Sequence, residues 1–187
     1  MNINFTGVYL SAVSTARAMI HHRTPGAMCF IGSMSGLIAN KNFTSSVYNP
    51  SKAAVIQLGR SLAMEWGRIP EFEDLSNHDK SLASSGRSGN SSDSSSSSSN
   101  SGRIRKANER KRGIRVNVLC PGNIMTPMVR KNFEDDPELR AVWEKENMMG
   151  RISEPEEYKG AVVFMLSDAS SFMTGSYIVI DGGYTAW

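Results

Sequence analysis

The sequence predicts an α/β fold in which helices cover a parallel sheet, and three observations support this class. Three short apolar runs alternate with helical patterns along the chain, as strands and helices do around a parallel sheet. Turn-forming residues follow each run directly. The 187 residues are 40% hydrophobic and 21% charged, a balance typical of one folded domain with a substantial core.

The chain is expected to begin with a helix and a buried strand. Apolar residues recur at three- and four-residue steps over residues 5–23, and the turn-forming residues 24–26 end that pattern. The run 27–31 (AMCFI) lies between turn signals and predicts a buried strand. A loop over residues 32–36 follows at the carboxyl end of this strand.

A second helix and a second strand come next. The helix is expected over about residues 46–66, with Ser46 as its N-cap and Pro50 early, where proline is tolerated. Residues 114–120 (IRVNVLC) are rich in β-branched residues and predict a strand that ends at residues 121–122.

The last third is expected to hold two helices and a final strand. A loop with one short helix is predicted over residues 123–150. Ser153 with Glu156 three residues later predicts a capping box that opens a helix. The last strand is expected over residues 177–180.

A polar segment, residues 67–112, interrupts this pattern. Thirteen of the 21 residues over 81–101 are serine, and six of the ten over 103–112 are basic. The composition predicts a disordered insertion that separates residues 1–66 from residues 113–187, the two parts of one domain. A phosphorylation target, a basic docking arm and a mistranslated intron are the alternatives.

Several classes of protein are not indicated. No apolar run reaches the ~18 residues of a membrane span, and no basic region precedes the N-terminal apolar stretch. Cys29 and Cys120 lie in apolar contexts, which argues against a disulfide framework. The net charge of +3 is small, and the basic residues around Arg103–Arg115 lack interleaved aromatics. We therefore expect a cytoplasmic protein without a metal, membrane or nucleic-acid partner.

The candidate catalytic residues lie where the predicted strands end. In open parallel sheets, active sites lie beyond the carboxyl ends of the strands. Ser33 follows the first strand, and Tyr48 and Lys52 project from one face at the start of the second helix. A phenol titrates near pH ~10, and a nearby cation stabilises its phenolate form. Such a tyrosine can exchange a proton with an alcohol or a carbonyl, and such proton exchange accompanies hydride transfer to nicotinamide.

Several motifs together resemble those of the short-chain dehydrogenase/reductase family. The resemblance extends over nearly the whole chain outside residues 67–112. The motifs are NFTG at 4–7, SMSG at 33–36, YNPSK at 48–52, GIRVN at 113–117, PG at 121–122, TG at 174–175 and DGG at 181–183.

The resemblance implies a three-layer, Rossmann-like, NAD(P)-binding fold and a set of site residues. Asn4, Ser33, Tyr48 and Lys52 match the catalytic tetrad of the family, and Ser35 is the alternative to Ser33. The resemblance also implies that six residues contact NAD or NADP. Two of them, Tyr48 and Lys52, also belong to the tetrad, and the others are Pro121, Gly122, Ile124 and Thr126.

The wording of the motifs is most similar to fungal polyol and ketose reductases of this family, of the mannitol, sorbose and arabinitol type. The resemblance therefore implies an NAD(P)-dependent enzyme that interconverts a secondary alcohol and a ketone, with a sugar alcohol or ketose as substrate. It also implies a homo-oligomer formed through the helices 5–23 and 46–66. The alternative is a catalytically incompetent fragment, or an oligomerisation partner without a site for the cofactor phosphates.

One family feature has no counterpart in the sequence. The family begins with a strand and a G-x-x-x-G-x-G turn that holds the cofactor pyrophosphate, whereas this chain contains no G-x-G. We therefore expect a domain truncated at its N-terminus, without the first strands and the glycine-rich turn. The choice between NAD and NADP then rests on residues outside this sequence.

Overall fold

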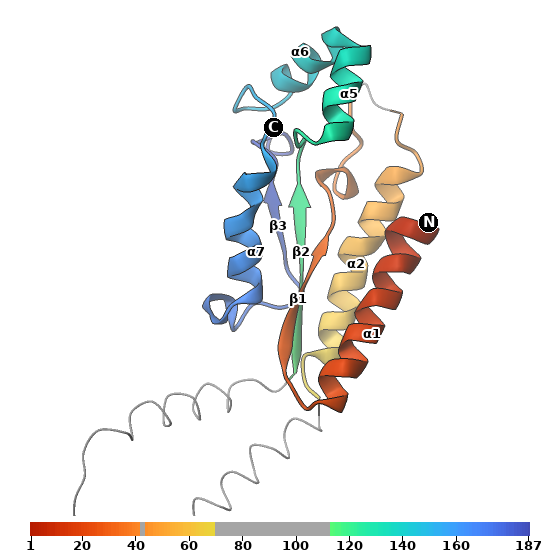
Figure 1. Cartoon of the computed structure of the whole chain (residues 1–187), viewed down its shortest axis with the longest axis vertical. Helices are drawn as coiled ribbons and strands as arrows, with labels where there is room; N and C mark the ends of the chain where they lie inside the picture. Colours follow the sequence, from red (N-terminus) through yellow and green to blue (C-terminus); the bar gives the residue numbers. More distant parts are fainter. Residues whose placement is uncertain (42–43, 70–112) are drawn as a thin grey trace, which may run out of the picture.

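A computed structural model describes residues 1–41, 44–69 and 113–187 as a parallel three-stranded sheet between two layers of helices (Figure 1). The strands are β1 (Gly26–Ile31), β2 (Ile114–Pro121) and β3 (Tyr177–Ile180), in the order β1-β2-β3. Strand β1 pairs in parallel with β2 along its whole length. The chain on both sides of residues 70–112 therefore contributes to one sheet, and the predicted α/β class is confirmed.

Helices cover both faces of this sheet. A π-helical turn, η1 (Asn2–Gly7), leads into α1 (Val8–His21), which shares one core cluster with α2 (Tyr48–Trp66). On the opposite face, α7 (Lys159–Leu166) packs against β1 and β2 (Figure 1). Two further helices, α5 (Pro127–Asp135) and α6 (Pro137–Lys145), lie beyond the carboxyl ends of the strands.

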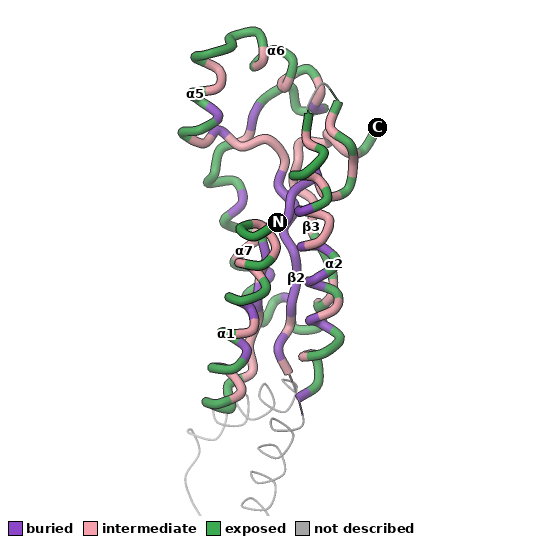
Figure 2. Tube along the Cα trace, turned by 90° about the vertical axis from the view of Figure 1, so that its right-hand side faces the viewer, coloured by how far each residue is buried: buried purple, intermediate pink, exposed green. Residues whose placement is uncertain are grey.

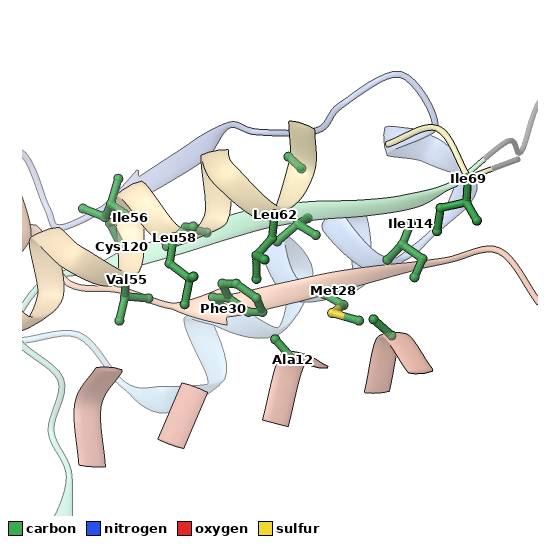
Figure 3. Close-up of a cluster of buried hydrophobic side chains, with 14 residues drawn as sticks. Ala12, Met28, Phe30, Val55, Ile56, Leu58, Leu62, Ile69, Ile114 and Cys120 are labelled. Carbon is green, nitrogen blue, oxygen red and sulfur yellow. The ribbon is translucent and has the colours of Figure 1, made fainter. Parts of the chain in front are cut away.

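Strand β2 is buried on both faces and forms the centre of the core (Figure 2). Ile114, Val116 and Val118 point toward the layer of α1 and α2, where Phe30 and Leu62 also lie (Figure 3). The alternate residue Leu119 packs instead with Met165 of α7. Strand β2 is therefore buried on both faces because helices lie on both sides of it.

Glycine at position 59 lets α2 approach the sheet closely. A Cβ atom on Gly59 would lie 2.5 Å from Cγ2 of Val118 and 3.8 Å from Cδ2 of Phe30. No side chain fits at that separation, so the residue sets the spacing between α2 and β2. The first turn of the same helix carries Tyr48, one of the predicted site residues.

The start of α2 differs from the expectation at Ser46. The helix begins at Tyr48, and its N-cap, Val47, contributes no side-chain hydrogen bond. The backbone carbonyls of Ser45 and Val47 accept from the amides of Asn49 and Ser51 instead. The prediction of a serine cap was wrong because backbone groups of the preceding turn satisfy these amides.

The segment 123–150 holds two helices, where the sequence predicted one. Thr126 caps α5, because its hydroxyl accepts from the amide of Val129, and Pro127 occupies the first turn. Pro137 has no amide hydrogen to continue that helix and begins α6 after Asp136. The prediction missed that this proline separates two helices.

The capping box before α7 lies one residue later than predicted. Glu154 and Glu157 form it at the start of a short 3₁₀ helix, η3 (Pro155–Tyr158), which leads into α7. Ser153 is not the cap, because its hydroxyl donates to the carbonyl of Asn123 and contacts the hydroxyl of Tyr158. Serine at this position therefore ties two loops together.

Most of the predicted insertion, residues 70–112, lies outside the described residues. Residues 67–69 are described, and Ile69 is buried within the main core cluster. Ile69 therefore packs with the first part of the domain. No helix in the described residues is long and apolar enough to cross a bilayer.

Candidate active site

A cavity of about 700 Å³ opens where β1 and β2 end. It lies between the loop after β1, the first turns of α2, the loop after β2 and the helices α5 and α6. Seven of the eight site residues predicted from the sequence line it: Ser33, Tyr48, Lys52, Pro121, Gly122, Ile124 and Thr126. The eighth, Asn4, is not part of its wall.

Ser33 lies in the tight loop that follows β1. It is the N-cap of a 3₁₀ turn, η2 (Met34–Gly36), and its hydroxyl accepts from the amide of Ser35 at 3.2 Å. A Cβ on Gly36 would lie 2.8 Å from the backbone of Lys52, so this turn is pressed against α2. Ser33 and Ser35 both line the cavity, and both stay candidates for the hydroxyl that contacts substrate.

Tyr48 and Lys52 lie one helical turn apart at the start of α2. The Tyr48 side chain is partly open to the cavity, with an exposed fraction of 43%. The Nζ atom of Lys52 lies 5.8 Å from the centre of the Tyr48 ring and donates to the carbonyl of Ile31 at 3.1 Å. The last residue of β1 therefore orients the ammonium group that lies beside the phenol.

The environment of Lys52 is partly desolvated. Burial lowers the pKa of its ammonium group. Burial raises the pKa of the nearby Cys120 thiol, which keeps this thiol protonated at neutral pH. A neutral thiol beside Lys52 leaves the lysine charge available to the phenol and to a ligand.

Asn4 acts behind the cavity wall. Its side-chain amide donates to the hydroxyl of Ser51 at 3.0 Å, and that hydroxyl donates to the carbonyl of Tyr48 at 2.7 Å. Ser51 is almost completely buried. The structure thus joins η1 to the helical turn that carries Tyr48, and it places Asn4 one layer behind the cavity.

Backbone hydrogen bonds fix the loop after β2. The amide of Gly122 donates to the carbonyl of Ile180, the last residue of β3. A Cβ on Gly122 would lie 2.6 Å from the Cα of Asp181, so only glycine fits between the two strand ends. These contacts fix the path of the chain between Pro121, the last residue of β2, and Ile124, and both residues line the cavity.

Sequence reasoning missed two residues that hold this loop. The Ser153 hydroxyl donates to the carbonyl of Asn123 at 2.7 Å and lies 2.7 Å from the Tyr158 hydroxyl. The amide of Met125 donates to the carbonyl of Ser153 at 2.8 Å. Burial raises the pKa of Tyr158, so this phenol stays neutral. The pattern of serine and glutamate around residue 153 indicated only a helix start.

Sequence reasoning also missed the wall that faces Ser33 and Tyr48. It comes from the loop after η2 and from α5 and α6, and it combines apolar and charged side chains. Examples are Lys41, Met128, Leu139, Val142, Trp143 and Glu146. Nothing in their spacing predicts a shared site, because the fold alone brings these helices above the strand ends.

The chemistry of the cavity wall fits the nicotinamide end of a dinucleotide. Tyr48 and Lys52 supply a hydroxyl and an ammonium donor of the kind that binds ribose hydroxyls. Ile31, Pro121 and Ile124 supply apolar contacts for a planar ring. Within residues 1–41, 44–69 and 113–187, no group of three or more metal-ligating side chains is arranged around a common point.

Two family models match the chain. A model described as short chain dehydrogenase matches residues 1–69, and one described as enoyl-(acyl carrier protein) reductase matches residues 106–185. Together they cover the chain on both sides of the segment 70–105.

Individual relatives match the whole chain. A short chain dehydrogenase/reductase of Aspergillus versicolor is 38% identical over 187 residues, which are 100% of this chain and 50% of the relative. A ribulose-forming D-arabinitol 2-dehydrogenase of Candida tropicalis is 34% identical, over 100% of this chain and 51% of the relative. The crystal structure of a short-chain type dehydrogenase/reductase from Mycobacterium marinum matches with a TM-score of 0.67 and 34% identity, over 98% of this chain and 54% of that one. The chain therefore spans about half the length of the curated relatives it matches.

Proposed function

The chain belongs to the short-chain dehydrogenase/reductase family, and we propose that it carries the substrate-reducing part of an NAD(P)-dependent oxidoreductase. The proposed reaction interconverts a secondary alcohol and a ketone. One observation carries the proposal: a single cavity at the strand ends holds Ser33, Tyr48 and Lys52 together.

In the proposed mechanism, Tyr48 exchanges a proton with the substrate oxygen. Its hydroxyl gives a proton to the carbonyl oxygen during reduction, and its phenolate form takes the proton from the alcohol during oxidation. The Lys52 ammonium, oriented by the carbonyl of Ile31, favours the charged phenolate that this exchange creates. When bound, a nicotinamide cofactor supplies or accepts the hydride at the carbinol carbon.

Ser33 orients the substrate in this mechanism. Its position in a buried, hydrogen-bonded turn fixes the hydroxyl before substrate arrives, so the reaction needs little reorganisation of the site. Ser35 lines the same cavity and is the alternative for this contact. Tyr48, Lys52, Pro121, Gly122, Ile124 and Thr126 would hold the nicotinamide and its ribose.

We further propose a sugar alcohol and the corresponding ketose as the substrates. The support is the similarity to the D-arabinitol dehydrogenase of Candida tropicalis, whose name gives a pentitol as substrate. The polar groups of the cavity wall are compatible with hydroxylated substrates of this size.

We also propose that α1 and α2 pair with a second copy of the chain. Apolar side chains on these helices and on η1 are exposed, including Ile3, Leu10 and Met64. Single exposed apolar residues are common on monomers, and the occurrence of several on the three elements of one layer supports the proposed interface. A protein without turnover that still self-associates would fit the alternative of an oligomerisation partner.

The test of the function is a kinetic comparison of two tyrosine variants. We expect wild-type protein to reduce a ketose with NADH or NADPH, and Tyr48→Phe to lose on the order of 99% of that turnover, as expected for loss of a general acid. Tyr9 on α1 has the same exposed fraction, 43%, and lies outside the cavity, so Tyr9→Phe is the matched control. Unchanged turnover in Tyr48→Phe would contradict the assignment.

A further inference from the structure

An ion pair on the wall of the cavity joins the loop after η2 to the end of α6. Nζ of Lys41, in the loop after η2, lies 3.6 Å from Oε1 of Glu146, at the end of α6. Both residues line the cavity that also holds Tyr48. The pair therefore borders the space that a substrate fills beyond its reacting carbon.

Glu146 is held in place by its neighbours. Its amide donates to the carbonyl of Val142, and the next residue, Asn147, is buried. The side-chain amide of Asn147 donates through Nδ2 to the carbonyl of Arg151 at 2.6 Å, and its Oδ1 accepts from the backbone amide of Met149 at 3.0 Å. The same Met149 amide also donates to the carbonyl of Gly182, after β3. The carboxylate thus projects from a backbone anchored to the sheet.

The two partners differ in their freedom. The Glu146 side chain has an exposed fraction of 24%, whereas that of Lys41 is 71%. A partly buried carboxylate on a fixed backbone is preorganised to accept hydrogen bonds, because little conformational freedom remains to be lost. Lys41 can move aside or donate a hydrogen bond when a ligand enters.

The charge around this pair is negative. Asp136 and Glu138, at the junction of α5 and α6, also line the cavity, so its charged lining residues are three carboxylates and the two amines of Lys41 and Lys52. An anionic group brought to the wall would meet uncompensated negative charge, and a neutral hydroxyl would not.

We propose that Lys41 and Glu146 form the subsite that binds the hydroxyl groups of an uncharged polyol or ketose, and that this wall rejects sugar phosphates and sugar acids. The inference rests on the proposed function, because the same cavity holds the reacting groups. Vicinal hydroxyls donate to the two oxygens of Glu146, and the Lys41 ammonium donates to a hydroxyl oxygen.

A binding measurement without cofactor tests this subsite. Trp143 lines the same wall, so its indole NMR signal, assigned with Trp143→Phe, reports ligand binding in the 187-residue chain. The probes are ribulose, ribulose 5-phosphate and ribonate. We expect saturable binding of ribulose and dissociation constants at least about tenfold higher for both anions.

Variants on one helix separate the subsite from general effects. Glu146→Gln is expected to weaken ribulose binding on the order of tenfold, because a charged acceptor is lost. Glu144→Gln is the matched control, since Glu144 pairs with Arg140 on α6 and does not line the cavity. Glu146→Lys should reduce the discrimination against ribulose 5-phosphate.

The possible outcomes distinguish the two proposals. Equal affinity for ribulose and its phosphate, unchanged ribulose binding in Glu146→Gln, or no ribulose binding at all overturns the subsite. Selective binding of ribulose with no hydride transfer from the cofactor overturns the proposed function and leaves the subsite intact. Hydride transfer at equal rates to charged and uncharged substrates overturns the subsite and leaves the proposed function intact.

Discussion

The side-chain amide of Asn4 donates a hydrogen bond to the buried hydroxyl of Ser51, 3.0 Å away, and this bond joins η1 to the first turn of α2. The sequence motif places Asn4 among the catalytic residues, whereas the structure places its side chain behind the cavity. The Ser51 hydroxyl in turn donates a hydrogen bond to the carbonyl of Tyr48. The two residues therefore position the turn that carries the phenol.

Removing the Ser51 hydroxyl should destabilise the protein and disturb this turn. Ser51→Ala leaves the Asn4 amide without its acceptor, which should lower the free energy of unfolding by about 1–2 kcal/mol. Urea denaturation measures the change. Ser61→Ala on the same helix is the control, because its hydroxyl bonds the carbonyl of Gln57 near solvent. Equal effects of the two variants would contradict a special role for Ser51.

Arg115 should be a major stabilising residue of the α7 side. Its guanidinium donates to the hydroxyl of Ser170 and to the carbonyls of Met165, Ser167 and Met173. Arg115→Met removes the donor from these carbonyls and should cost about 2–4 kcal/mol in unfolding free energy. Arg60→Met, which loses a cation–π contact with Tyr177, should cost about 0.5–1 kcal/mol. A smaller loss for Arg115→Met than for Arg60→Met would refute this prediction.

Two glycine substitutions should have opposite signs. Gly59→Ala places a methyl group 2.5 Å from Cγ2 of Val118, so overpacking should destabilise the protein by about 1–3 kcal/mol. A Cβ on Gly160 in α7 would meet no atom within 4 Å, so Gly160→Ala should stabilise by up to about 1 kcal/mol. Thermal unfolding of both variants gives the comparison, and a stabilising Gly59→Ala would show that α2 is not seated on the sheet.

The Arg151–Glu157 pair should make stability depend on pH in the acid range. A bidentate contact with Arg151 lowers the pKa of Glu157 from 4.5 to about 2. The folded state therefore binds fewer protons than the unfolded state between these values, and stability rises with pH across that window. The contribution is fully present above pH 4.5 and is lost as the pH falls through about 2.

Glu157→Gln should flatten this part of the pH profile of unfolding. Glu156→Gln is the control, because Glu156 is a neighbouring carboxylate in an exposed ion pair. Its Oε1 lies 3.5 Å from Nζ of Lys159. Denaturation midpoints measured at several pH values between 2 and 4.5 provide the test. If the pH dependence of stability persists in Glu157→Gln and disappears in Glu156→Gln, the titrating group is Glu156 and the prediction is wrong.

The local sequence pattern was sufficient to predict the strands and the long helices. The last strand was predicted with its observed bounds, Tyr177–Ile180, because a β-branched run between turn signals has few alternatives. Helix boundaries were less accurate. Ser46 and Ser153 are good caps by residue type, yet one is replaced by backbone acceptors and the other bonds Asn123.

The site was predictable only where motifs follow strand ends. Tyr48 and Lys52 are four residues apart in one helix, so helical periodicity places them on the same face. Glu146 and Lys41 are far apart in the sequence, and only the placement of α6 above the sheet brings them together. Asn4 shows the converse, because a motif match identifies a residue without indicating where its side chain points.

The proposed oxidoreductase site can be tested most directly by following the hydride itself. Purified 187-residue protein is mixed with a ketose and with NADH or NADPH that carries deuterium at the reactive carbon. Mass spectrometry then locates the label. We predict one deuterium at the new carbinol carbon with wild-type protein and none with Tyr48→Phe. Unlabelled alcohol, or no alcohol, from wild-type protein with either cofactor would contradict the assignment of Ser33, Tyr48 and Lys52 to a working active site.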